Sequence, residues 1–191
     1  NFSFFKIDPK WRWMADLAKE ESAKEVENVI INSGIRFRSY STLGLRDDAE
    51  FLFWFAAETV EEIQAVISKL YLTVFGKYII PSRVYLSCTR PSTYARKGRT
   101  LSFVAGEEPR KFVIVYPFTK TREWYLLPKE QRQKMMDQHI DVSEKYPQVI
   151  LNTTYSFGIS DQDFMLAFEC DNLRDFQNLI MDLRQTQVSA Y

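Results

Sequence analysis

Two segments of the chain share one order of apolar and polar positions. Residues 40–55 and 154–168 run in parallel with a slip of one residue, and each contains a glycine followed within three residues by an aspartate. This combination favours a hairpin turn, because glycine readily adopts a positive φ and aspartate hydrogen-bonds its own backbone. Each segment ends in an apolar, aromatic run typical of a central strand, at 51–55 and 164–168. The pattern therefore predicts an internal repeat.

Helical periodicity follows each of these strand pairs. Apolar residues recur at helical spacing within 59–70 and 172–183, which predicts two amphipathic helices covering two antiparallel sheets. A further helix is expected before each repeat, at 9–34 and at 128–145, the second opened by one proline and followed by another. The order of strand, helix, strand, strand, helix, strand thus occurs twice. It predicts an α+β fold of two ferredoxin-like (split βαβ) halves.

A polar stretch at 96–110, which contains two glycines and a proline, is expected to separate the two halves. We place the N-terminal half at 1–98, a linker at 99–110 and the C-terminal half at 111–191. Basic residues in this stretch are typical of a linker or of the rim of a site.

Composition narrows the class of protein. Lysine plus arginine equal aspartate plus glutamate, 25 against 25, so no net charge draws the chain to nucleic acid or to an anionic membrane. No apolar run approaches the roughly 18 residues of a membrane span, and the first residues lack the pattern of a signal peptide. Cys88 and Cys170 form no C-x-x-C pair, which disfavours a zinc site. We expect a soluble, cytoplasmic protein, trimmed at its ends.

His139 is the one histidine of the chain, so any histidine chemistry depends on it. A single imidazole cannot form a multi-histidine metal site, but it suffices as the axial ligand of a haem. The ordinary alternative is a solvated histidine near a helix C-terminus, where its positive form is favoured by the helix dipole. The sequence lacks the motifs of dinucleotide-binding, nucleotide-hydrolysing, zinc-protease and serine-hydrolase sites.

The stretch 112–125 is unusual in its combination of residues. A run of β-branched residues ends in Tyr116 and a proline, and Lys120 and Trp124 follow. Taken singly, the two aromatic residues are ordinary core residues and the lysine an ordinary surface charge. Only their arrangement together indicates a site.

These fragments together resemble the chlorite dismutase superfamily, and within it the coproheme decarboxylases of haem biosynthesis. The resemblance covers nearly the whole chain and is carried by residues 44–48, 90–94, 116–118, 124–128, 132–139, 158–161 and 183–189. It implies two fused ferredoxin-like halves of the dimeric α+β barrel type, a haem pocket in the C-terminal half and a ring of usually five subunits, here a homopentamer. The decarboxylases use hydrogen peroxide to convert two propionates of iron coproporphyrin III, their substrate and cofactor, into the vinyl groups of haem b.

The resemblance also implies roles for single residues. His139 falls where the family keeps its iron ligand, and Tyr116 falls where the decarboxylases keep the tyrosine that becomes an oxidising radical. Lys120 is expected to pair with the carboxylate that leaves, using a mobile ammonium charge. The residues expected to contact the porphyrin or its propionates are Tyr94, Trp124, Asn152, Arg184 and Ser189.

Two departures separate the branches of the family. Chlorite dismutases need an arginine thirteen residues after the histidine, where this chain has Asn152, and a neutral amide cannot supply that charge. They also place a glutamate against the second imidazole nitrogen, where this chain aligns Val188. Without a carboxylate the ligand is less basic, which suits the decarboxylases better.

Four functions stay open on this basis. The first is a coproheme decarboxylase with Tyr116, Lys120 and His139 in the roles above. The second is a porphyrin carrier or sensor without turnover, which Asn152 permits. The third, chlorite dismutation, is disfavoured by the absent arginine, and the fourth is a ring protein without a cofactor, in which His139 is a surface residue.

Overall fold

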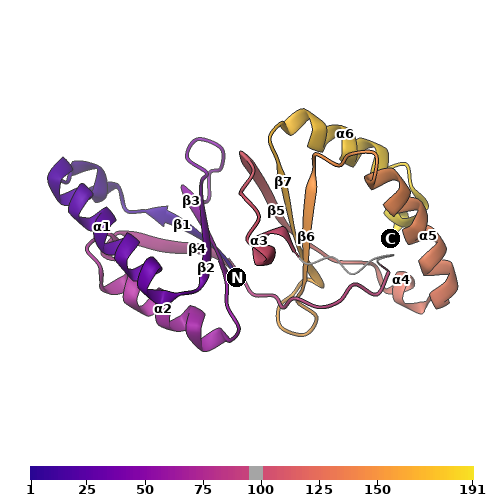
Figure 1. Cartoon of the computed structure of the whole chain (residues 1–191), viewed down its shortest axis with the longest axis horizontal. Helices are drawn as coiled ribbons and strands as arrows, with labels where there is room; N and C mark the ends of the chain where they lie inside the picture. Colours follow the sequence, from indigo (N-terminus) through magenta and orange to yellow (C-terminus); the bar gives the residue numbers. More distant parts are fainter. Residues whose placement is uncertain (95–100) are drawn as a thin grey trace. The chain divides into compact units, whose positions relative to one another are not determined.

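The computed structural model describes residues 1–94 and 101–191, which divide into two compact units, Asn1–Leu86 and Ser87–Tyr191 (Figure 1). The expected linker at 99–110 begins outside the described residues. Within its described part, Ser102–Ala105 forms a short helix, α3, of the second unit. Among the helices described, none is both long enough and apolar enough to cross a bilayer.

The first unit is a four-stranded antiparallel sheet with two helices. Its strands are β1 (Phe2–Ile7), β2 (Arg36–Ser41), β3 (Phe51–Ala56) and β4 (Ile79–Tyr85), in the order β2-β3-β1-β4. Helix α1 (Asp16–Ser33) connects β1 to β2, and α2 (Val60–Leu72) connects β3 to β4. This order is the split βαβ arrangement that the sequence predicts for the first half.

The expected helix at 9–34 is divided in two. A 3-10 helix, η1 (Pro9–Trp13), is capped by the Asp8 side chain, and α1 begins only at Asp16. Met14 and Ala15 between them are extended, with ψ angles of 147° and 143°. The other helix of this unit begins where expected, because Thr59 and Glu62 form a reciprocal capping box at the start of α2.

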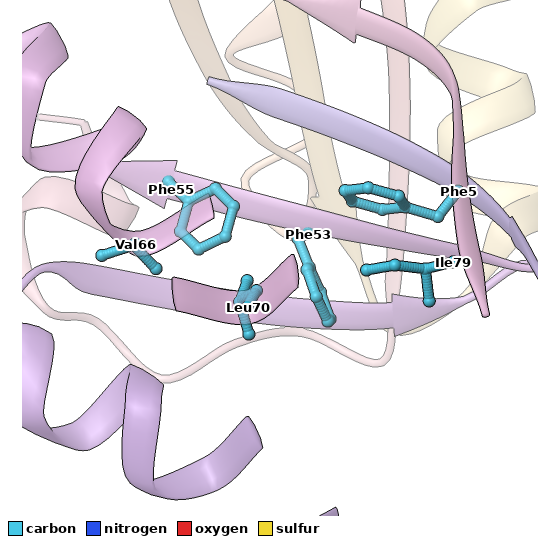
Figure 2. Packing of buried hydrophobic residues seen from close by; sticks show 6 residues of the cluster. All are labelled: Phe5, Phe53, Phe55, Val66, Leu70 and Ile79. Atoms are coloured by element: carbon cyan, nitrogen blue, oxygen red, sulfur yellow. The ribbon is translucent and has the colours of Figure 1, made fainter. Parts of the chain in front are cut away.

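Apolar side chains from the sheet and from α2 form the core of the first unit (Figure 2). The fully enclosed members of this cluster are Phe5, Phe53, Phe55, Val66, Leu70 and Ile79. The phenylalanines lie at alternate positions of their strands, so they point to the same side of the sheet, where the apolar stripe of α2 covers them.

The second unit repeats this pattern with three strands. Its strands are β5 (Phe112–Phe118), β6 (Ile150–Tyr155) and β7 (Phe164–Cys170), in the order β5-β7-β6, and all pairs are antiparallel. Its helices are α4 (Arg122–Leu126), α5 (Lys129–Ser143) and α6 (Leu173–Leu183). Where the repeat predicts a last strand, the chain forms a 3-10 helix, η3 (Gln187–Ala190).

The two repeat turns have the predicted chemistry. Gly44 and Gly158 adopt φ angles of 73° and 71°, the left-handed region that glycine enters without strain. Each turn leads into the central apolar strand of its half, β3 or β7. The hairpin prediction from the paired glycine and aspartate is therefore confirmed in both halves.

Strand register divides the second sheet into two faces. One of them, which we call the helix-covered face, carries Ile114, Tyr116, Leu151, Thr153, Leu166 and Phe168. Most of these residues pack against Leu179 and Leu183 of α6 and Val142 of α5. Figure 1 shows both helices along this side of β5, β6 and β7. The functional residues expected in this half can therefore be assigned to one face or the other.

Replacing Leu70 with alanine is expected to lower the free energy of unfolding by about 2–5 kcal/mol, because the deletion leaves a cavity in the core of the first unit. Leu72 on the same helix is the matched control: it is 81 % exposed against 1 % for Leu70, and its alanine variant should stay within about 0.5 kcal/mol of the wild type. Urea unfolding followed by circular dichroism measures both. Equal losses for the two variants would contradict this packing.

Candidate functional site

His139 lies within α5, four residues before the helix ends at Ser143, and not at its exposed end. The imidazole is half-buried, and its Nδ1 atom lies 3.2 Å from the hydroxyl oxygen of Thr186. Burial, followed by the charge of Lys120, lowers the pKa of His139 from 6.5 to about 4. The side chain is therefore a neutral imidazole near pH 7, unlike the solvated, dipole-stabilised histidine of the ordinary alternative.

Lys120 lies just after β5 and is half-buried. Its ammonium donates a hydrogen bond to the carbonyl oxygen of Val188, at 2.9 Å, and lies 5.0 Å from the centre of the Trp124 ring and 5.1 Å from that of Phe118. Burial lowers the pKa of Lys120 to about 8. Its charge also lowers the pKa of His139, so the ammonium lies near the imidazole as well as at the C-terminal segment.

Trp124 and Val188 are enclosed, 2 % and 1 % exposed, in one apolar cluster with Met135 of α5. Tyr94 borders this cluster: its ring lies 6.1 Å from that of Trp124, and its hydroxyl accepts a hydrogen bond from Arg132. The structure thus gives Trp124 and Tyr94 packing roles beside Lys120. Their expected contacts with a porphyrin stay predictions.

Tyr116 lies on the helix-covered face, with its ring stacked 5.9 Å from that of Phe168. Burial raises the pKa of this phenol, and the nearby positive charge of Arg184 partly opposes that rise. Arg184 directly follows the last residue of α6 and is exposed. Among the described residues its guanidinium has no hydrogen bond or ion pair, so this cation is available to an anion beside the tyrosine.

Asn152 is not brought together with these residues. It pairs with Ala167 on the face of the sheet opposite Tyr116, and it is 1 % exposed. Its amide donates to Glu169 at 2.9 Å, and its oxygen lies 2.9 Å from the hydroxyl of Ser102 in α3. These bonds satisfy the hydrogen-bonding groups of a polar cluster buried on the face opposite α5 and α6. The two neighbours of Asn152 in β6, Leu151 and Thr153, are the residues that lie on the helix-covered face.

Ser189 is placed in the C-terminal turn. Its hydroxyl donates to the carbonyl oxygen of Leu183 at 2.5 Å and lies 3.3 Å from the hydroxyl of Thr186. The valine expected to replace a glutamate beside the imidazole, Val188, is turned into the apolar cluster. The imidazole's partner is Thr186 instead, which the sequence reasoning missed.

Asp163 is a second residue that the sequence did not indicate. One of its carboxylate oxygens accepts hydrogen bonds from the Tyr125 hydroxyl at 2.6 Å and from the backbone N–H of Lys120 at 3.1 Å. The aspartate therefore fixes the loop that carries Lys120 to the turn before β7. The only signal in the sequence was its position beside the repeated turn, which is equally typical of turn chemistry.

The residues present fit an iron porphyrin. The Nε2 atom of His139 has no hydrogen-bond partner among the described residues, and a neutral imidazole nitrogen is a common iron ligand. A half-buried phenol and an unpaired guanidinium lie on the neighbouring sheet and helix end. An apolar surround with a few charged groups is what a porphyrin ring with carboxylate side chains requires.

The fold and this site define an α+β protein of two split βαβ units, with one imidazole available as a ligand. The chain belongs to the chlorite dismutase family, because the family's profile, described as "Chlorite dismutase", matches residues 18–191. The resemblance inferred from the sequence is thereby confirmed.

Individual relatives agree with this membership. A coproheme decarboxylase from Mycolicibacterium smegmatis is 37% identical over 153 residues, which make up 80% of this chain and 66%, just under two thirds, of that protein. Chlorite dismutase from Candidatus Nitrospira defluvii in complex with imidazole superposes with a TM-score of 0.88, at 26% identity, over 99% of this chain and 83% of that one. A doubly substituted variant of the same dismutase gives a TM-score of 0.88 at 27% identity, with the same coverage.

His139 is expected to make the stability of the metal-free protein depend on pH. Its folded pKa of about 4 lies below the ordinary 6.5, so between these values the unfolded chain binds a proton that the folded chain does not. Stability should therefore fall as the pH falls from 6.5 towards 4, by up to about 1.4 kcal/mol per pH unit. Urea unfolding of the wild type and of His139→Gln through this window isolates the effect. Parallel curves would show that the imidazole is not buried as described.

Proposed function

We propose that this protein is a coproheme decarboxylase, which converts two propionates of iron coproporphyrin III into vinyl groups with hydrogen peroxide and gives haem b. The observation that carries the proposal is the placement of Tyr116 beside an unpaired cation, on the sheet face that α5, the helix of His139, also covers. The coproheme decarboxylase from Mycolicibacterium smegmatis, a relative at 37% identity, supports the same reaction. A cytoplasmic location, a homopentamer and the half boundaries at 98 and 111 stay predictions from the sequence.

Each turnover removes two electrons from one propionate. The propionate loses a hydrogen atom from its β-carbon, one further electron and carbon dioxide, and the product is a vinyl group. Hydrogen peroxide takes up the two electrons with protons and becomes two molecules of water. The bound iron porphyrin supplies the redox centre at which peroxide is reduced, so the protein has to position the reacting side chain and manage its protons.

Tyr116 is suited to the hydrogen transfer. Its half-buried phenol is protonated near pH 7, because the ordinary pKa of tyrosine, 10.0, already lies well above 7 and burial raises the pKa further. A phenol in this state can lose an electron and a proton together, and the neutral radical formed can take the hydrogen atom from the propionate. Packing against Phe168 holds the ring in one orientation, which the short reach of a hydrogen transfer requires.

The two cations of the site are assigned to charge and proton control. Arg184 has no partner among the described residues and can hold a propionate carboxylate next to Tyr116. Lys120 donates one N–H to Val188 and keeps two more for a carboxylate or water. With a pKa of about 8, it is charged at neutral pH yet can release a proton at modest cost.

Replacing Tyr116 with phenylalanine is expected to abolish decarboxylation while leaving porphyrin binding intact, because only the transferable hydrogen is lost. Mass spectrometry of the porphyrin after mixing with peroxide measures the lost carboxyl groups, and a Soret titration measures binding. Tyr155→Phe is the matched control and should keep turnover. A wild type that binds iron coproporphyrin III but releases no carbon dioxide would instead be a porphyrin carrier or sensor.

Arg184→Gln is expected to weaken the binding of iron coproporphyrin III by about 10–100-fold, the loss typical of one charge-assisted hydrogen bond. Arg174→Gln is the control, since Arg174 is an exposed arginine in the first turn of the same helix. Fluorescence quenching by the porphyrin gives both dissociation constants. Equal affinities for the two variants would remove Arg184 from the site.

A further inference from the structure

The end of α6 gathers two hydroxyl groups on one carbonyl oxygen. The hydroxyl of Thr186 donates to the carbonyl oxygen of Leu183 at 2.6 Å, and that of Ser189 donates to the same oxygen at 2.5 Å. The backbone N–H of Thr186 also bonds this oxygen, at 3.1 Å. The last carbonyls of a helix lack partners within it, so these bonds complete the helix end and fold the chain back.

This arrangement fixes the direction of the hydroxyl proton of Thr186, which points to the carbonyl oxygen of Leu183. If that proton pointed elsewhere, two oxygen atoms 2.6 Å apart would face each other with lone pairs only, which is a repulsive contact. Since a hydroxyl has one proton, the oxygen of Thr186 must accept at its contact with Nδ1 of His139, which is 3.2 Å away. The Ser189 hydroxyl, 3.3 Å from the same oxygen, does not alter this, because its own proton is donated to Leu183. Nδ1 therefore carries the hydrogen, and Nε2 keeps its lone pair.

We propose that Thr186 is the positioning residue that fixes His139 in the Nδ1–H tautomer and so leaves Nε2 as the nitrogen that binds iron. The role towards iron rests on the proposed function, whereas the tautomer itself is a property of the porphyrin-free chain. A hydroxyl partner is neutral, so it orients the imidazole without drawing its proton away as a carboxylate would.

The surroundings keep Thr186 in this position. Thr186 is 5 % exposed, and Val188, two residues further on, is 1 % exposed in the cluster with Trp124 and Met135. The Val188 carbonyl oxygen accepts the hydrogen bond from Lys120. The turn that carries Thr186 is thus held by the end of α6 on one side and by Lys120 on the other. Because the acceptor oxygen is fixed in this way, the hydrogen bond from Nδ1 limits rotation of the imidazole ring about its Cβ–Cγ bond.

The tautomer can be read directly by nuclear magnetic resonance, because the chain has one histidine. In porphyrin-free protein with ¹⁵N-labelled histidine, correlations between ring nitrogens and ring carbon-bound hydrogens show which nitrogen is protonated. We expect Nδ1–H and an unprotonated Nε2 in the wild type. Observation of Nε2–H in the wild type would overturn the proposal.

Three variants distinguish the effect of the hydrogen-bond acceptor on the tautomer from the effect of the shape of the turn. Thr186→Val keeps the shape but removes the acceptor, so we expect the Nδ1–H signal to be lost in favour of Nε2–H or of exchange between the two. Thr186→Ser keeps the oxygen and should retain the wild-type signal, as should Ser189→Ala, which leaves Thr186 in place. An Nδ1–H signal that persists in Thr186→Val, or is lost equally in Ser189→Ala, would contradict the assignment.

The effect of Thr186 on iron binding by His139 is measured separately. With haem b as the probe, Thr186→Val should bind about 10–100-fold more weakly than the wild type, and the iron–histidine stretching band in the Raman spectrum of the reduced protein should shift. Unchanged affinity and an unshifted band would overturn this part. Absence of decarboxylation in a wild type with the expected tautomer would count against the proposed function alone.

Discussion

The packing of α6 on Phe168 is the interaction on which the site of the second unit depends. Phe168 is 3 % exposed on the helix-covered face, where it contacts Leu179 and Leu183 and lies 5.1 Å from the ring of Phe176. Burial of several large apolar side chains in one layer is the main stabilising contribution available to a helix on a sheet. The same contact fixes where α6 ends. The site residues Arg184 and Thr186 follow that end, within three residues of Leu183.

The charges of the site follow from this geometry. Arg184 opposes the rise in the pKa of Tyr116, whereas Lys120 donates to the carbonyl of Val188 and lowers the pKa of His139, so the two cations act on different groups. Lys120 makes protonation of His139 less favourable, and Arg184 makes ionisation of the phenol easier than burial alone would allow. A chain without net charge thus places one cation near each of these two side chains, which suits the carboxylates of the proposed substrate.

The sequence predicted the fold more fully than the site. The repeat, the turns at Gly44 and Gly158 and the covering helices depend on local periodicity and turn chemistry, which can be read from neighbouring residues. Thr186 and Asp163 were missed because their partners lie 47 and 43 residues away, and no local pattern encodes such contacts. The final strand was expected from the repeat, but the two hydroxyls that bond Leu183 close the chain into a 3-10 turn there.

Asn152 shows why the assignment of this chain to one branch of the family could not depend on a single aligned position. Side chains alternate across a strand, so a slip of one residue moves a residue to the other face of the sheet. Asn152 is buried behind the sheet, but the β6 residues on the helix-covered face, Leu151, Thr153 and Tyr155, are also uncharged. The strand therefore supplies no cation in either register. Of the described residues, the cations whose charges act on His139 and Tyr116 lie just after β5 and just after α6 instead, and they suit the carboxylates of the proposed substrate.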